Sequence, residues 1–101
     1  AKSSLSRLGL TLGQLDGVSR AKYKIGGNVK GVLVAAVDPS GSAAEKNVRP
    51  GDVIVEVSGQ AVNSPDQVSK RLDADIKAGK KVELFLINRA GDLTYVGLRL
   101  G

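Results

Sequence analysis

The sequence of 101 residues contains neither cysteine nor histidine. Without cysteine the chain cannot form a disulfide or a thiolate metal site, although this absence fits any redox compartment. Without histidine it cannot hold a Ser-His-Asp or Cys-His nucleophile system, and zinc sites built on His or Cys are excluded too. Among these kinds of catalytic site, only one built from carboxylates remains.

The acidic residues do not form a pair with the spacing of a general acid and base. Asp73 and Asp75 lie two positions apart in a stretch with helical periodicity, so their side chains point in different directions. Asp66 lies about two helical turns before Asp73, and we expect both to be solvated. Asp52 follows a Pro-Gly pair, where we interpret it as a carboxylate that caps a turn. With no nucleotide-binding glycine motif either, we expect no catalytic site, no metal site and no cofactor.

Aromatic residues and long apolar runs are scarce. Only Tyr23, Phe85 and Tyr95 are aromatic, so we expect an aliphatic core. The longest purely apolar run, residues 32–37, is far too short to cross a membrane, and no signal peptide is recognisable. The length fits one domain, which we place at residues 1–101 with 1–6 as the remnant of a linker.

Charge is unevenly distributed along the chain, and the formal net charge is +5. No acidic residue occurs between Asp16 and Asp38. We interpret the basic residues of this stretch as a solvated surface, and the alternative is a field that attracts anionic partners. Nucleic acid is not an expected partner, because the basic clusters are short and lack interleaved aromatic side chains for base stacking. The basic residues in question are Arg20, Lys22, Lys24 and Lys30.

Periodicity predicts several strands. Leu8, Leu10 and Leu12 alternate with other residues, which indicates a strand with one apolar face near the start of the chain. The continuous Val-rich run at 31–38 is typical of a strand buried on both faces. The remaining strand segments are 52–57, a short piece at 61–62, and 81–89 and 92–100, which a hairpin turn joins.

One helix is strongly indicated between residues 63 and 79. Ser64 and Gln67 form a capping-box pattern, with Pro65 at the first helical position. Gly79 is suited to end the helix. Apolar residues recur every four positions, which gives the helix one apolar stripe. These residues are Val68, Leu72 and Ile76.

Shorter helical segments and a tight turn complete the pattern. We expect a helical turn near residues 18–24 and another through 42–47 with Ser42 as its cap. Pro50 and Gly51 suit the two central positions of a type II turn. The predicted fold class is α+β: a small, partly open β-barrel or sandwich of five to six strands, capped by one main helix and one short helix.

The stretch VRPGDVIVEVSGQAV, residues 48–62, followed by a capped helix and two closing strands, strongly resembles a PDZ domain. The preceding GSAAEKN is similar to the family's short helix, and the resemblance covers nearly the whole chain from about Leu8 to Leu100. The order of elements resembles that of bacterial HtrA (Deg-type) serine proteases, with the second of two such domains as one candidate. Site-2 proteases and tail-processing proteases also carry PDZ modules.

The resemblance implies a peptide-binding groove between a sheet edge and the main helix. The stretch Arg7-Leu8-Gly9-Leu10 matches the family's X-Φ-Gly-Φ loop, whose backbone N–H groups bind a terminal carboxylate. Thr11 and Leu12 continue the strand. On the helix, the resemblance places Pro65, Ser69 and Leu72 toward the groove, and Val68 and Ile76 toward the core. Leu72 would close the pocket for the last side chain, so we expect it to be only partly buried without a peptide.

The function that the resemblance implies is peptide binding. The expected partners are hydrophobic C-termini or extended, unfolded segments, together with other domains of a parent protease. The chain itself would not be an enzyme but a non-catalytic piece of a periplasmic HtrA-type protease, without insertion into the membrane. The alternative is a docking module for inter-subunit assembly of the parent protease, with its groove unused or blocked.

Overall fold

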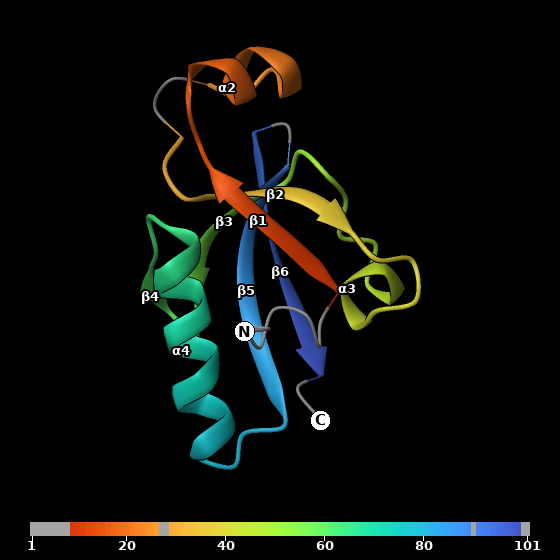
Figure 1. The fold of residues 1–101 in the computed structure, drawn as a ribbon, viewed down its shortest axis with the longest axis vertical. Helices are drawn as coiled ribbons and strands as arrows, with labels where there is room; N and C mark the ends of the chain where they lie inside the picture. The colour runs from red at the N-terminus through yellow and green to blue at the C-terminus, as the bar shows by residue number, and fades with distance from the viewer. Residues whose placement is uncertain (1–8, 27–28, 90, 100–101) are drawn as a thin grey trace.

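A computed structural model describes residues 9–26, 29–89 and 91–99, and within these ranges it shows six strands and three helices (Figure 1). The helix over residues 17–23, expected only as a turn, brings the number of helices to one more than the predicted fold class contained. The elements in chain order are β1 (Leu10–Gln14), α2 (Gly17–Tyr23), β2 (Val32–Val37), α3 (Ser42–Glu45), β3 (Val53–Val57), β4 (Gln60–Ala61), α4 (Pro65–Lys77), β5 (Val82–Arg89) and β6 (Asp92–Arg99).

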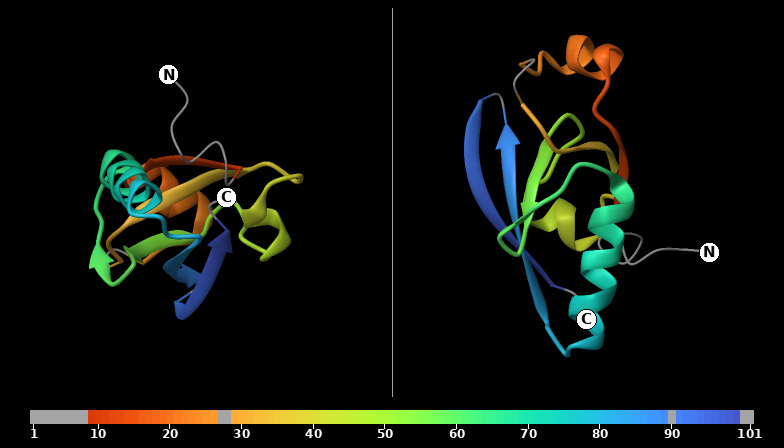
Figure 2. Two further views of the ribbon diagram at one scale, coloured as in Figure 1. Left: turned by 90° about the horizontal axis from the view of Figure 1, so that it is seen from below. Right: turned by 90° about the vertical axis from the view of Figure 1, so that its left-hand side faces the viewer.

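All six strands belong to one antiparallel sheet. The strands follow the order β1-β2-β3-β5-β6, and β4 pairs with β3 outside this path. The sheet is open rather than closed into a barrel, because β1 and β6 lie at its two ends. The predicted α+β class with a partly open sheet is therefore confirmed. In Figure 2, α4 and β1 lie on one side of the molecule, across from the β5–β6 hairpin.

The main helix and the Pro-Gly turn form as the sequence predicts. The Ser64 hydroxyl accepts a hydrogen bond from the Gln67 N–H at 3.4 Å, and Gly79 follows the helix with a φ of 86°. In the turn, Gly51 has a φ of 97° and the Asp52 N–H donates to the Arg49 carbonyl at 3.2 Å. The Asp52 carboxylate accepts from the Arg49 N–H at 2.9 Å, which confirms its role in capping the turn.

The strand β2 corrects one prediction, because only its first half is buried. Val32, Leu33 and Val34 are buried, whereas Ala35 and Ala36 are exposed. The pairing divides β2 at the same place: Val32 and Leu33 pair with β3, Val34 exchanges backbone hydrogen bonds with Gly51 and Asp52, and the residues after Val34 pair with β1 alone. The Val-rich run therefore predicts a strand correctly here, but it does not show which of the strand's residues the rest of the domain covers.

The cap of α3 is a second correction. Gly41, not Ser42, occupies the N-cap position, and no side chain caps this end of the helix. The preceding turn is organised by Asp38 instead, whose carboxylate accepts from the N–H and the hydroxyl of Ser40 at 2.9 and 2.8 Å. These two hydrogen bonds lower the pKa of Asp38.

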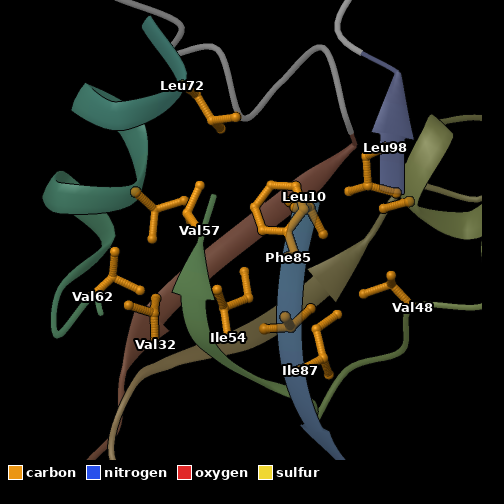
Figure 3. Close-up of a cluster of buried hydrophobic side chains, with 13 residues drawn as sticks. Leu10, Val32, Val48, Ile54, Val57, Val62, Leu72, Phe85, Ile87 and Leu98 are labelled. Atoms are coloured by element: carbon orange, nitrogen blue, oxygen red, sulfur yellow. The ribbon is translucent and has the colours of Figure 1, made fainter. Parts of the chain in front are cut away.

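The core is aliphatic around a single aromatic ring, as the composition predicts. Phe85 of β5 is fully buried and belongs to the same cluster as Leu10 of β1 (Figure 3). Residues from the sheet, α3 and α4 contribute to the same cluster, so β1 and α4 are both anchored in it. The buried members are Leu10, Val32, Val34, Ala43, Val48, Ile54, Val57, Val62, Val68, Leu72, Phe85, Ile87 and Leu98.

Candidate functional site

The site suggested by the sequence begins at Gly9, immediately before the edge strand β1. Gly9 has a φ of 77°, which L side chains rarely adopt, and its carbonyl accepts from the Asp38 N–H at 2.7 Å. A Cβ at this position would lie 3.0 Å from the Asp38 Cβ and 3.1 Å from the Gly41 Cα. Both the backbone conformation and the close approach therefore require glycine. Arg7 and Leu8, the other expected members of this loop, lie outside the described residues.

Along β1, the side chains divide between the core and the surface. Leu10 is 6% exposed and belongs to the core, and Leu12 is half-buried against it. Thr11 is exposed. The register with β2 shifts between Thr11 and Leu12. The backbone of β1 pairs with β2 on one side only, since β1 ends the sheet.

The helix α4 lies next to β1 and contributes to the same cluster (Figures 2 and 3). Pro65 and Ser69 are half-buried, Val68 is buried as expected, and Ile76 packs against the cluster while partly exposed. Leu72 has an exposed fraction of 0%, so the expected partial exposure without a peptide is wrong. The stripe of α4 that faces β1 also faces the core, and α4 packs closely enough to cover Leu72.

An ion pair that the sequence did not reveal holds the Pro-Gly turn. Arg89 Nη2 lies 2.8 Å from Asp52 Oδ2 and Arg89 Nε lies 3.0 Å from Asp52 Oδ1. Arg89 also donates to the Asn47 carbonyl at 2.7 Å. The hydrogen bonds with Asp52 raise the pKa of Arg89. This clamp joins the turn before β3 to the end of β5, with the Asp52 carboxylate buried.

A second unforeseen cluster brings two carboxyl groups together. Asp75 of α4 and Glu83 of β5 are both buried, and the Ser58 hydroxyl contacts each of them. Burial, followed by the neighbouring Asp75, raises the pKa of Glu83 to about 7. Sequence spacing predicted no general acid–base pair, and it did not reveal this pair because the fold brings the two residues together from separate elements. A substrate cannot reach this pair from solvent, since Glu83 is fully buried.

Two further properties concern only the part of the chain that the structure describes. It contains no group of three or more acidic residues placed to hold a metal ion. None of its helices combines the length and the apolar character that crossing a bilayer requires.

Comparison with known proteins gives matches over most of the chain. The family model described as a PDZ domain matches residues 6–97. A probable periplasmic serine endoprotease, DegP-like, from Brucella suis is 38% identical over 69 residues, which cover 68% of this chain and 14% of that protein. Its counterpart from Halomonas elongata is 41% identical over 70 residues, covering 69% and 14%. The magnetosome formation protease MamE of Magnetospirillum gryphiswaldense is 38% identical over 72 residues, covering 71% and 9%.

Solved structures show the same fold. The HtrA-type protease AlgW with a decapeptide superimposes with a TM-score of 0.75 at 20% identity, covering 91% of this chain and 27% of that one. The HtrA3 PDZ domain bound to a phage-derived ligand, FGRWV, gives a TM-score of 0.70 at 16% identity, covering 91% and 81%. The predicted resemblance to PDZ domains of HtrA/Deg-type proteases is confirmed, although the chain spans only a small part of the curated relatives. With an edge strand beside a capped helix and a family match over residues 6–97, this chain belongs to the PDZ domain family.

Proposed function

We propose that this domain binds hydrophobic C-terminal or extended peptide segments by strand addition at β1, and that it serves an HtrA-type protease in substrate binding and regulation. The observation that carries the proposal is the position of β1, which ends the sheet and lies next to α4. Alternate peptide groups of an edge strand point away from its neighbour and are free to pair with an added strand. The neighbours AlgW and HtrA3, each solved with a peptide, support this reading.

The chemistry of recognition follows from the two ends of the site. The terminal carboxylate of the peptide lies against backbone N–H groups of the loop around Gly9, whose positive φ suits an anion-binding nest. The last side chain of the peptide enters between Leu10 and Leu72, which both belong to the apolar cluster. The proposed binding residues are Arg7, Leu8, Gly9, Leu10, Thr11, Leu12, Pro65, Ser69 and Leu72.

We also propose a cellular location for the parent protein. Several relatives are named periplasmic endoproteases, and the chain corresponds to 14% of their length, so we place the parent protein in the periplasm and its catalytic site elsewhere in that protein. The domain itself binds its ligand without changing it covalently. Its partners are peptide segments and the other domains of the parent protease.

The test compares acetylated pentapeptides that differ only at the C-terminus, as free acid and as amide, with FGRWV as the first probe. A charge-assisted hydrogen bond is worth about 1.5–3 kcal/mol, so amidation should weaken binding roughly tenfold or more. Long-range attraction to the basic surface is screened over about 8 Å at physiological salt, whereas a contact inside the nest is screened less. A difference that persists at high salt supports carboxylate recognition, and a difference that vanishes there reflects surface charge alone.

A second candidate function, docking between subunits, is favoured by one observation. The outward face of the β5–β6 hairpin exposes large apolar side chains, with Tyr95 63% and Leu93 60% exposed. Leu86 and Tyr95 are directly paired across the two strands, and the hairpin's other exposed apolar residues lie on the same two strands. If free-acid and amidated peptides bind equally weakly at both salt concentrations, docking replaces peptide binding as the function. The exposed apolar residues of this hairpin are Val82, Leu84, Leu93 and Tyr95.

A further inference from the structure

Three elements meet at a buried cluster beneath the C-terminal half of α4. Asp75 comes from α4, Glu83 from β5, and Ser58 from the turn between β3 and β4. The Ser58 Oγ lies 3.5 Å from Asp75 Oδ2 and also contacts Glu83 Oε1. Glu83 Oε2 is buried and has no hydrogen-bond partner. The cluster forms a polar contact between this half of α4 and the sheet.

The proton count of the cluster favours a neutral Glu83. A serine hydroxyl carries one hydrogen, so Ser58 can donate to only one of the two carboxyl groups. The two contacts are both hydrogen bonds when a protonated Glu83 donates to Ser58 and Ser58 donates to Asp75. If both carboxyl groups ionise, one of these contacts loses its hydrogen, and two negative charges face each other in a buried place.

The surrounding charges balance Asp75 rather than Glu83. From α4, Arg71 Nε lies 3.3 Å from Asp75 Oδ2, and from the segment after α4, Lys80 Nζ lies 3.8 Å from Asp75 Oδ1. From β6, the residue paired with Glu83 is the apolar Leu98. Within the described residues, no ion pair reaches Glu83 itself. Ionised Glu83 would therefore lack a direct counter-charge.

We propose that the Asp75–Ser58–Glu83 cluster is a protonation-dependent latch that holds α4 against β5 and thereby regulates peptide entry beside β1. This inference rests on the proposed function. Asp75 lies one helical turn after Leu72, so the latch acts on the part of α4 that covers Leu72. Leu10 and Leu72 are 6% and 0% exposed, so a peptide side chain can contact both only if α4 moves away from β1. Ionisation of both carboxyl groups loosens α4 and favours that movement.

The latch operates near neutral pH. Burial and the proximity of Asp75 raise the pKa of Glu83 to about 7, although Lys80 and Arg71 oppose this shift. The sequence contains no histidine, so no other side chain with an ordinary pKa titrates at neutral pH. A change in behaviour across this range that Glu83→Gln abolishes therefore points to the cluster. Low pH closes the latch, and high pH opens it.

The first experiment measures hydrogen exchange of the backbone amides of α4 in the full chain without peptide. Exchange is compared at about pH 5.5 and about pH 8, after correction for the intrinsic rates, because these values lie on either side of the raised pKa. We expect protection of residues 72–78 in the wild type to fall about fivefold or more at the higher pH. Glu83→Gln, whose amide can donate to Ser58 at any pH, should keep the high protection throughout. Glu45→Gln changes an exposed carboxylate and should behave as the wild type.

The second experiment measures the affinity for the acetylated free-acid peptide FGRWV, which has no group that titrates in this range. In the wild type and in Glu45→Gln, affinity should rise about fivefold from the lower to the higher pH. In Glu83→Gln it should stay at the low-pH value. Ser58→Ala removes the hydroxyl group that connects the two carboxyl groups. We therefore expect this variant to bind the peptide tightly, and its α4 amides to be weakly protected from exchange, already at the lower pH.

The outcomes separate the latch from the proposed function. Equal protection of α4 at both pH values in the wild type overturns the latch, whatever the peptide does, and requires no variant to fold. A responsive α4 with an affinity independent of pH overturns the regulation of peptide entry. A responsive α4 in a domain that binds no peptide at either pH supports the latch and refutes the proposed function.

Discussion

Arg89, near the end of β5, donates two hydrogen bonds to the buried carboxylate of Asp52, 37 positions earlier in the chain. The same carboxylate accepts from the Arg49 N–H, so one side chain closes the Pro-Gly turn and ties it to β5. This turn precedes β3, the strand that joins the β1–β2 half of the sheet to the β5–β6 half. The contact therefore stabilises the junction of the sheet rather than a surface loop.

Replacement of Asp52 by Asn should lower the free energy of unfolding by about 1–3 kcal/mol, because charged hydrogen bonds are lost from a buried group. Since Arg89 is partly exposed and can turn to water, we expect the lower part of this range. Asp66→Asn is the matched control, because its ion pair with Lys70 is exposed and should contribute less than about 0.5 kcal/mol. Denaturant unfolding measures both, and equal losses would show that the clamp is unimportant.

Gly9→Val should reduce peptide affinity more strongly than it reduces stability. A left-handed conformation costs a non-glycine residue roughly 1–2 kcal/mol, and the new Cβ would press on Asp38. Peptide affinity should fall further, because the N–H groups proposed to bind the peptide carboxylate would be redirected. Gly13→Val in the adjoining strand β1 is the control, since the Cβ there would meet Ala35 at an ordinary 3.9 Å. Unchanged affinity in Gly9→Val would exclude this loop from the binding site.

Leu72→Ala should destabilise the domain by about 2–5 kcal/mol, the range for truncation of a fully buried leucine. This expectation follows from the complete burial of Leu72 and exceeds what a half-exposed groove residue would cost. Leu84→Ala, at an exposed position of β5, should cost much less. Chemical denaturation compares the two variants. A loss for Leu72→Ala no greater than that for Leu84→Ala would contradict its place in the core.

Stability should depend on pH through Glu83. Its pKa is raised from 4.5 to about 7 in the folded state, so the folded protein retains a proton that the unfolded chain has lost. Unfolding then releases this proton, and the free energy of unfolding falls as pH rises from about 4.5 to about 7. Each unit of pKa difference corresponds to about 1.4 kcal/mol. Glu83→Gln should remove this decline in denaturant titrations across the range, whereas an identical decline in the variant would assign it to another group.

The purified domain should not hydrolyse unfolded casein. It has no histidine, and its one buried carboxylate pair is closed to substrate. A fluorescent casein assay with an inactive preparation as the contamination control measures this. Cleavage that co-purifies with the domain through several independent steps would contradict the assignment of a binding module.

Local patterns explain why much of the fold can be predicted from the sequence. The cap at Ser64, the Pro50-Gly51 turn and the alternation around Leu10 each depend on residues a few positions apart, so their chemistry is visible in the chain. The edge position of β1 could be predicted only through the resemblance to a family. Its neighbour in the sheet is fixed by long-range pairing that no local pattern contains.

The parts that could not be predicted depend on distant residues. Asp75 and Glu83 meet because α4 and β5 pack together, and neither residue's neighbours in sequence show this. The exposure of Leu72 could not be predicted for a different reason. Periodicity places it on the apolar stripe of α4, but the stripe faces β1 and the core at once. Only the packing distance between helix and strand decides how much of Leu72 solvent can reach.

The helix α2 buries none of its residues, so the helix itself adds little to the core. Gln14 and Val32, at the two ends of the excursion, are directly paired across β1 and β2. Residues 15–31 are thus an insertion into what is topologically a plain hairpin. The excursion does contact the rest of the domain: the Tyr23 ring packs over Gly51, and the buried Gly31 lies so close to the Ile54 carbonyl that a Cβ would not fit. A shorter connection that kept these contacts would leave the β1–β2 hairpin itself unchanged.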